Sequence, residues 1–234
     1  MNNSAELTVS AASSLTDVLT EMGRAFERVN PDVTVHFSFA ASGVLLQQIR
    51  QGAPVDVLVS ASLRELDTLA TEQKIEAKSR VTLTGNRLVL VAPVGSALRR
   101  WDELATAAAP RIALANPEFV PAGRYAKETL SRRGLWTAVV PKAVYGQNVR
   151  QVLAYVASGD VAAGLVFATD AAREKRVRIV ATAQPGKDHE PIVYGAAVIR
   201  RSLQSRLARR FIAFLKSPSG QATFAHYGFR PAGR

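Results

Sequence analysis

Apolar and polar positions follow a repeating order along this chain, in which a short strand-like run precedes a longer segment with helical spacing. The run Leu7–Ser10 leads into such a segment, which Pro31 ends, and the order repeats from Val33–Phe39 and from Val55–Val59. Short strands that alternate with amphipathic helices predict an α/β fold with largely parallel sheets. The apolar positions of the first helical segment are Leu15, Val18, Leu19, Met22 and Phe26.

The order changes where Val81–Leu83 and Leu88–Val91 follow each other across Gly85-Asn86 with no helix between them. This break predicts that the chain crosses into a second lobe, with a return crossing between Val177–Ala181 and Ile192–Ile199. We expect residues 1–84 and 196–234 to form lobe 1 and residues 85–195 to form lobe 2. Hinged α/β lobes commonly bind a ligand in the cleft between them.

The C-terminal region predicts two helices, near Leu203–Leu215 and Ser219–Tyr227, that close the first lobe. Apolar residues of the first recur at helical spacing, so its arginines are expected on the solvated face. The apolar set is Leu203, Leu207, Phe211, Phe214 and Leu215, and the arginines are Arg200, Arg201, Arg206, Arg209 and Arg210.

Four turns between a strand and a helix are built from small or polar residues. A helix start leaves backbone N–H groups without intrahelical acceptors and is partly positive, so an anion suits it. Such turns are also ordinary helix caps, and the pattern alone leaves both interpretations open. The turns are Ala11–Thr16, Phe39–Val44, Asn116–Gly123 and Gly146–Val149, with hydroxyl donors at Ser14 and Ser42 and close backbone approach at Gly43 and Gly123.

The formal net charge is +11, from 30 basic and 19 acidic residues. This charge suits nucleic acid, a small anion or simply a solvated surface, and no zinc-finger, RNP or basic-zipper pattern accompanies it. The absence of cysteine excludes disulfides, thiolate metal sites and cysteine nucleophiles. No stretch approaches the roughly 20 apolar residues needed to span a bilayer.

Catalytic signatures are lacking in the sequence. His36, His189 and His226 are scattered, and there is no Walker loop, nucleophile elbow or dinucleotide fingerprint. The acidic pairs Glu65/Asp67 and Asp102/Glu103 are expected on solvated helix faces. We therefore expect a protein that is not an enzyme, with no cofactor and no residue that binds a metal cation directly.

At the same turns the sequence resembles the periplasmic molybdate-binding proteins of bacterial ABC importers. The segments that carry the resemblance extend in order from about residue 7 to 229, and the run Val120-Pro121-Ala122-Gly123-Arg124-Tyr125-Ala126-Lys127-Glu128 is distinctive. They are Ala11–Thr16, Phe39–Gly43, Gly52–Ala61, Gly85–Pro93, Pro117–Glu128, Asn148–Arg150 and Tyr227–Phe229.

The resemblance implies a two-lobed type II periplasmic binding protein fold with mixed sheets flanked by helices, two hinge crossings and an oxyanion in the cleft between lobes. It implies ligand contacts from the hydroxyl and N–H groups of Ser14 and Ser42 and from the N–H groups of Ala122 and Val149. Many members add a tyrosine hydroxyl where this chain has Phe167. Ser13, Tyr145 and Tyr125 are the candidates for supplying that hydroxyl.

The implied function is binding of molybdate, and of tungstate, in the periplasm and delivery to an inner-membrane ABC permease. No basic leader and apolar core of a signal peptide precede Leu7, which leaves open a cytosolic protein or a mature form without its signal peptide. The resemblance implies the mature form. We expect a monomer that binds no nucleic acid. The alternatives are a receptor for sulfate or another oxyanion, a ligand-binding regulatory module, a basic nucleic-acid-binding protein and a cofactor-free enzyme on the same fold.

Overall fold

The computed structural model describes residues 4–232, and the chain in it divides into two compact units. The first unit comprises Met1–Gly85 and Val193–Arg234, and the second comprises Asn86–Ile192. The expected lobe boundaries placed residues 85 and 193–195 in the second lobe. They belong to the first unit because β10 (Val193–Val198) pairs with strands of that unit along its length, and Gly85, the last residue of one of those strands, is the register partner of Val193.

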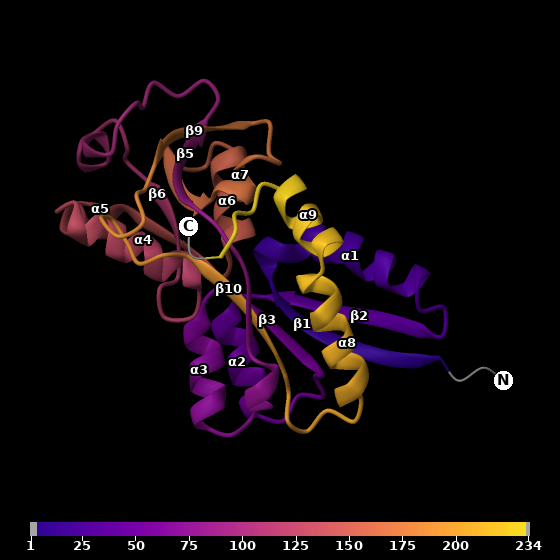
Figure 1. Cartoon of the computed structure of the whole chain (residues 1–234). Coiled ribbons are helices and arrows are strands. Elements are labelled where there is room, and N and C mark those ends of the chain that lie inside the picture. The colour runs from indigo at the N-terminus through magenta and orange to yellow at the C-terminus, as the bar shows by residue number, and fades with distance from the viewer. Residues whose placement is uncertain (1–3, 233–234) are drawn as a thin grey trace. The chain divides into compact units, whose positions relative to one another are not determined.

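The first unit contains a five-stranded mixed sheet in the order β2-β1-β3-β10-β4 (Figure 1). β1, β2 and β3 run parallel, whereas β10 is antiparallel to β3 and β4. β3 is buried at every position, as expected for a central strand covered on both faces. The bounds are β1 Ala5–Ala12, β2 Val33–Ala40, β3 Val57–Ser60 and β4 Val81–Gly85.

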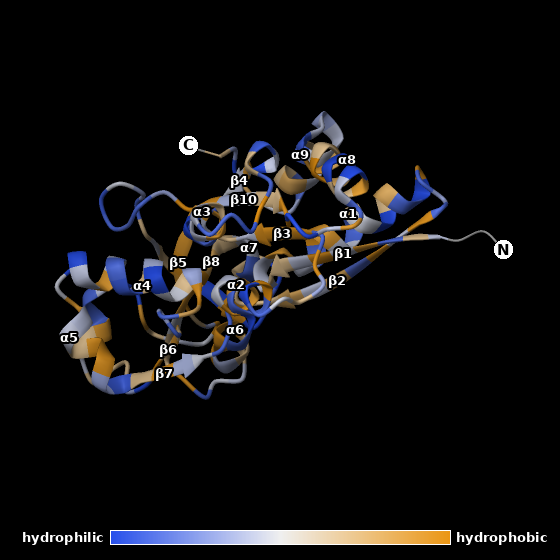
Figure 2. Ribbon diagram, turned by 90° about the horizontal axis from the view of Figure 1, so that it is seen from below, coloured by the Kyte–Doolittle hydropathy of each residue, from blue (hydrophilic) through white to orange (hydrophobic). Residues whose placement is uncertain are grey.

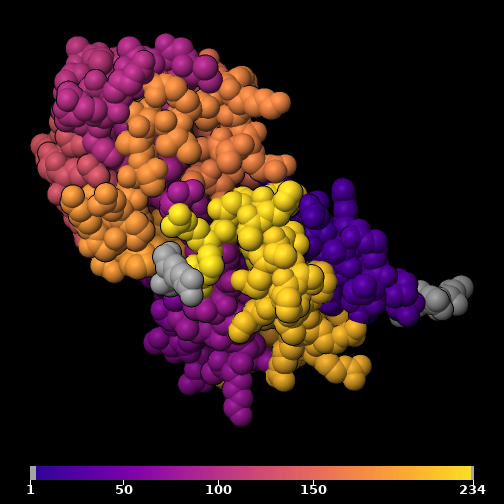
Figure 3. All heavy atoms as spheres, turned by 45° about the horizontal axis from the view of Figure 1, so that its top comes forward, coloured from indigo at the N-terminus to yellow at the C-terminus, as the bar shows by residue number. Residues whose placement is uncertain are grey.

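Helices cover both faces of this sheet. α1 packs against α8 and α9, and the rings of Phe26 in α1 and Phe211 in α8 meet edge to face with their centroids 5.2 Å apart. Figure 3 shows the C-terminal helices packed beside the N-terminal segment. α2 and α3 form a separate apolar cluster with Leu58 and Ala197 of the sheet. The bounds are α1 Thr16–Arg28, α2 Ser42–Arg50, α3 Leu63–Thr71, α8 Ser205–Lys216 and α9 Pro218–His226, with 3₁₀ turns η1 Ser13–Leu15 and η2 Ala77–Ser79.

The second unit contains another five-stranded mixed sheet, in the order β7-β6-β8-β5-β9. β6 is parallel to β7 and β8, and β5 is antiparallel to β8 and β9. Figure 2 shows apolar strands and helices with mixed polar and apolar residues, the pattern of a core covered by amphipathic helices. The bounds are β5 Leu88–Pro93, β6 Ile112–Ala115, β7 Ala143–Gly146, β8 Ala163–Phe167, β9 Val177–Thr182, α4 Pro121–Arg132, α5 Trp136–Val139, α6 Val149–Ala157, α7 Ala168–Ala171, η3 Asp102–Ala105 and η4 Val140–Lys142.

Two sequence-based expectations about individual positions were wrong. Leu203 was expected on the apolar face of a helix, but α8 begins at Ser205, and Leu203 lies before it in a turn and is 97% exposed. Arg200 and Arg201 also lie before α8, in an exposed turn. Glu65 was expected on a solvated face, but it is only 2% exposed and accepts a hydrogen bond from Ser60 Oγ at 3.1 Å. No helix among residues 4–232 is both long and apolar enough to cross a membrane.

Candidate oxyanion site

In the first unit, strand register brings two of the predicted turns to the same sheet edge. β1 and β2 are parallel and end as register partners at Ala12 and Ala40. Ser14 and Ser42 each follow two residues later, so both lie beyond the carboxyl ends of adjacent strands. Ligands of α/β proteins gather at this edge, and both serines are buried there.

Ser42 is arranged as a hydrogen-bond donor. It is the first residue of α2, is 0% exposed, and its Oγ accepts from the N–H of Ala61 at 3.1 Å. Within residues 4–232 its hydroxyl hydrogen has no acceptor. The first intrahelical bond runs from Leu45 N–H to the Ala41 carbonyl, so the N–H groups of Ser42, Gly43 and Val44 precede the helical ladder.

The sequence predicted that a helix starts at this turn. In the structure, Ser14 lies in the 3₁₀ turn Ser13–Leu15, and α1 begins directly after it, at Thr16. Its Oγ lies 2.9 Å from the hydroxyl of Tyr194, and both groups are buried. Ser13 is 8% exposed, and its carbonyl accepts from Thr16 Oγ1 at 2.7 Å. The first turn therefore combines two serines with a tyrosine hydroxyl from β10.

In the second unit the other two turns also share a sheet edge. β6 and β7 are parallel and end at the register pair Ala115 and Gly146, and the N–H of Asn116 bonds the Gly146 carbonyl at 3.0 Å. α4 begins after β6 and α6 begins after β7, so Ala122 and Val149 both follow the carboxyl ends of adjacent parallel strands.

The start of α4 leaves a single backbone donor. Pro121 has no N–H, and the N–H groups of Gly123 and Arg124 both bond the Val120 carbonyl, at 3.0 and 3.1 Å. Ala122 N–H, which lies between them, has no backbone acceptor among the residues that the structure describes. The local sequence thus isolates the N–H group that the resemblance assigns to the ligand.

Gly123 lies where α4 approaches β6 most closely. A Cβ atom at this position would lie 2.2 Å from the Ala115 carbonyl oxygen and 2.8 Å from the Asn116 carbonyl carbon. Real Cβ contacts do not reach such distances with backbone atoms, so only glycine fits here without moving the helix. The close approach fixes the position of the neighbouring Ala122 N–H.

The start of α6 is capped by Asn148, whose side chain accepts from Gln151 N–H at 3.0 Å, leaving Val149 N–H ahead of the helical ladder. The next residue, Arg150, places its Nε 2.6 Å from Oδ1 of the fully buried Asp170. The guanidinium charge beside Val149 is therefore matched by a carboxylate from α7. Because the charge of Arg150 is paired with Asp170, the donors at this helix start are neutral backbone N–H groups.

Phe167 is 1% exposed at the carboxyl end of β8, where α7 begins, and its ring lies 6.4 Å from that of Tyr125. Tyr125 also makes an edge contact with the ring of His189 at 5.6 Å. Tyr145 lies within the edge strand β7 and is 44% exposed. Roles for Phe167, Tyr125, Tyr145 and Ser13 in ligand contact stay predictions.

Residues 7–230 match the sequence profile of the bacterial extracellular solute-binding proteins. The chain belongs to that family. Its fold is that of the two-lobed periplasmic binding proteins, as the sequence predicted.

Similar proteins include a Bacillus subtilis lipoprotein, YvgL, that is named for substrate binding in an ABC transporter. It is 39% identical over 225 residues, which are 95% of this chain and 85% of the relative. The molybdate-binding protein ModA of Haemophilus influenzae is 35% identical over 97% of this chain and 90% of its own length. The structure of the periplasmic molybdate-binding protein of Azotobacter vinelandii matches with a TM-score of 0.87 and 25% identity, over 95% of this chain and 98% of that one. The resemblance found in the sequence is confirmed.

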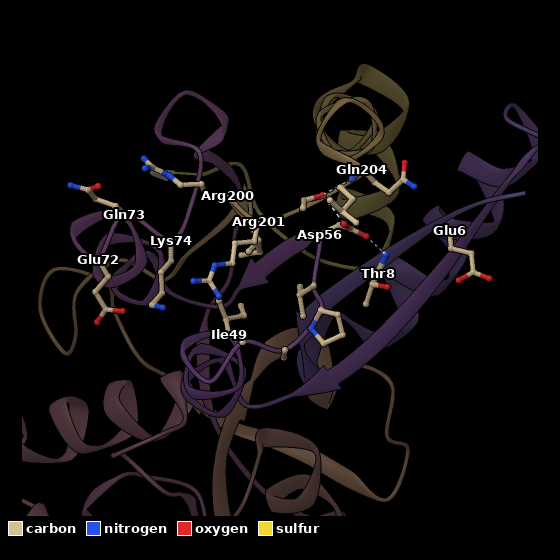
Figure 4. A pocket seen from close by; sticks show the side chains of 17 residues that line it. Glu6, Thr8, Ile49, Asp56, Glu72, Gln73, Lys74, Arg200, Arg201 and Gln204 are labelled. Carbon is tan, nitrogen blue, oxygen red and sulfur yellow. Dashed lines mark hydrogen bonds between the residues drawn. The ribbon is translucent and has the colours of Figure 1, made fainter.

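Figure 4 shows a cavity of about 760 Å³ in the first unit of this solute-binding protein. Its lining includes Asp56, just before β3, whereas the two serines lie beyond the carboxyl ends of β1 and β2. The cavity is lined by the start of β1, the loop before β3, the turn after β10 and the C-terminal ends of α2 and α3. Its central carboxylate, Asp56, accepts from Thr8 N–H at 2.8 Å and from Ser202 Oγ at 2.6 Å. That carboxylate therefore joins three segments of the sheet edge.

Two residues with defined contacts at the helix starts of this solute-binding protein escaped sequence reasoning. Tyr194 meets Ser14 across 180 residues of sequence, a separation that no local pattern reveals. Asp170 is a single acidic residue that follows the buried strand β8, and this position is a signal for a buried carboxylate. Its partner, Arg150, lies on another helix, so local sequence does not reveal the pair. No group of three or more His, Cys, Asp or Glu side chains that could hold a metal ion occurs within residues 4–232.

Proposed function

We propose that this protein binds molybdate as a deprotonated tetrahedral oxyanion and delivers it to the membrane permease of an ABC transporter. The names of its relatives support this proposal, since they include molybdate-binding proteins and an ABC-transporter lipoprotein. The observation that carries it is the presence, in each unit, of two helix starts beside each other at a carboxyl sheet edge, with donors that precede the helical ladder.

The proposed binding mechanism uses oriented neutral dipoles. Ser14 and Ser42 contribute hydroxyl and N–H groups, and Ala122 and Val149 contribute N–H groups. A deprotonated dianion has only acceptors, so a set of donors matches it fully. A protonated phosphate must also donate, and a donor without an acceptor costs on the order of 1–3 kcal/mol.

The remaining parts of the proposal concern partners and location. We propose that the protein acts in the periplasm as a monomer, takes tungstate as well as molybdate, requires no cofactor and catalyses no reaction. The family supports a role in solute binding outside the cytoplasm. Ser14 and Ser42, in the first unit, supply four of the six proposed donor groups, and Ala122 and Val149, in the second unit, supply the other two.

An anion panel in a thermal-shift assay tests the proposal. A ligand that binds only the native state raises its melting temperature, and at 100 times its Kd it adds about 2.7 kcal/mol, or roughly 5–10 °C for a chain of this size. We expect this shift with molybdate and tungstate, and a much smaller one with phosphate at the same concentration.

Sulfate is the informative comparison in that panel because it is also an acceptor-only dianion. A larger shift with sulfate than with molybdate would identify a receptor for another oxyanion. No shift with any anion, together with salt-sensitive binding to duplex DNA, would instead support the nucleic-acid alternative.

A further inference from the structure

We propose that Tyr194 is a positioning residue for oxyanion binding, in that its hydroxyl orients the Ser14 hydroxyl to donate to the ligand. This inference rests on the proposed function. It starts from the buried contact of 2.9 Å between Ser14 Oγ and the Tyr194 hydroxyl, in which the two residues are 4% and 0% exposed.

Sheet topology explains how residues 180 positions apart meet. β10 is antiparallel to β3, so its first residues lie beside the carboxyl end of β3, where Gly195 is the register partner of Ser60. β1 and β2 end at the same edge because they are parallel to β3. Tyr194 therefore enters the edge that carries Ser14 directly after the chain returns from the second unit.

The Tyr194 ring is held in place by other aromatic side chains. It makes an edge contact with Phe229 at 5.5 Å, and Phe229 makes another with Phe224 of α9 at 5.6 Å. Edge-to-face packing of buried rings fixes their orientation, so the phenolic oxygen has a defined position beside Ser14. A fixed oxygen is what a positioning role requires.

Hydrogen-bond chemistry then sets the direction of the pair. Each hydroxyl carries one hydrogen, so in a Ser–Tyr pair one oxygen donates and the other accepts. When Ser14 gives its hydrogen to an oxyanion, its lone pairs accept from Tyr194, and each bond polarises the other. If Ser14 instead donated its hydrogen to Tyr194, it would have only lone pairs to present to the dianion, and these would repel it.

Ser42 shows the same arrangement with a different partner. Its oxygen accepts from Ala61 N–H at 3.1 Å, and its hydrogen is left for another acceptor. Both serines thus have an oxygen that a protein donor can occupy and a hydrogen that a ligand can take. Tyr194 supplies for Ser14 what a backbone N–H supplies for Ser42.

Titration calorimetry with molybdate on the Tyr194→Phe variant tests this inference. The substitution keeps the ring and removes only the hydroxyl, so we expect Kd to rise roughly tenfold, on the scale of a charge-assisted hydrogen bond. The control is Tyr227→Phe, which removes a hydroxyl of the same unit that bonds Glu21 at 2.7 Å, and should leave Kd unchanged.

A double-mutant cycle separates positioning from a merely structural role. If Tyr194 acts through Ser14, then Tyr194→Phe should have no further effect on Kd in a Ser14→Ala background. The inference would be overturned if Tyr194→Phe alone left Kd unchanged, or if Tyr194→Phe raised Kd as much in the Ser14→Ala background as in the wild type. Molybdate binding by the wild type would stand in both cases. A wild-type protein with no saturable molybdate response would overturn the inference and the proposed function together.

Discussion

Arg150→Met is expected to destabilise the second unit by about 3–5 kcal/mol, because it removes the guanidinium from a fully buried carboxylate. Asp170→Asn should cost clearly less. The side chain of Arg150 is 31% exposed and can turn toward water, whereas that of Asp170 is 0% exposed and cannot. Arg150→Met should therefore lose more stability than Asp170→Asn, because it keeps the buried carboxylate and removes its cationic partner.

Urea unfolding followed by tryptophan fluorescence measures this difference selectively. The chain has two tryptophans, Trp101 and Trp136, and both belong to the second unit. The matched control is Arg176→Met, which breaks an exposed pair with Glu174 in the same unit and should leave the transition unchanged. An Asp170→Asn variant that is less stable than Arg150→Met would contradict the asymmetry.

Gly123→Ala is expected to cost about 3 kcal/mol, near the upper end for overpacking, and to weaken molybdate binding. The added Cβ would meet the Ala115 carbonyl oxygen at 2.2 Å, and a backbone atom within a sheet cannot rotate away. α4 must therefore move off β6, which displaces the Ala122 N–H.

Gly95→Ala is the matched control for that substitution. Gly95 lies in the same unit, and a Cβ there has no neighbour within 4 Å. The same fluorescence transition and a molybdate titration report both effects. A Gly123→Ala protein with wild-type stability would show that the start of α4 is not held against β6 as described.

Local patterns sufficed to predict the fold because each strand and helix carries its own periodicity. The strand runs beginning near Leu7, Val33 and Val55 match β1, β2 and β3, and the break at Gly85-Asn86 matches the first crossing between units. The same local reasoning was wrong for Leu203 and Glu65. Helical spacing cannot show that α8 starts at Ser205, nor that Ser60 stands beside the carboxylate of Glu65.

The candidate site could be predicted only as far as its helix starts. Small polar residues identify such turns, but they do not tell which N–H groups lack acceptors. At α4, that distinction depends on the Val120 carbonyl. It accepts hydrogen bonds from the N–H groups of Gly123 and Arg124, and the Ala122 N–H between them has no backbone acceptor among the described residues. The hydroxyl of Tyr194 lay beyond prediction, since its contact with Ser14 depends on the antiparallel pairing of β10.

Molybdate titration calorimetry on Ser42→Ala and Ser14→Ala tests most directly whether these helix starts hold the anion. Each variant should bind roughly tenfold or more weakly than the wild type, because each loses a hydroxyl donor to a charged ligand. The control is Ser217→Ala, whose hydroxyl caps α9 by accepting from Gly220 N–H at 3.1 Å, and which should keep full affinity. Unchanged molybdate affinity in both Ser42→Ala and Ser14→Ala would show that these serines have only a structural role and do not bind the ligand.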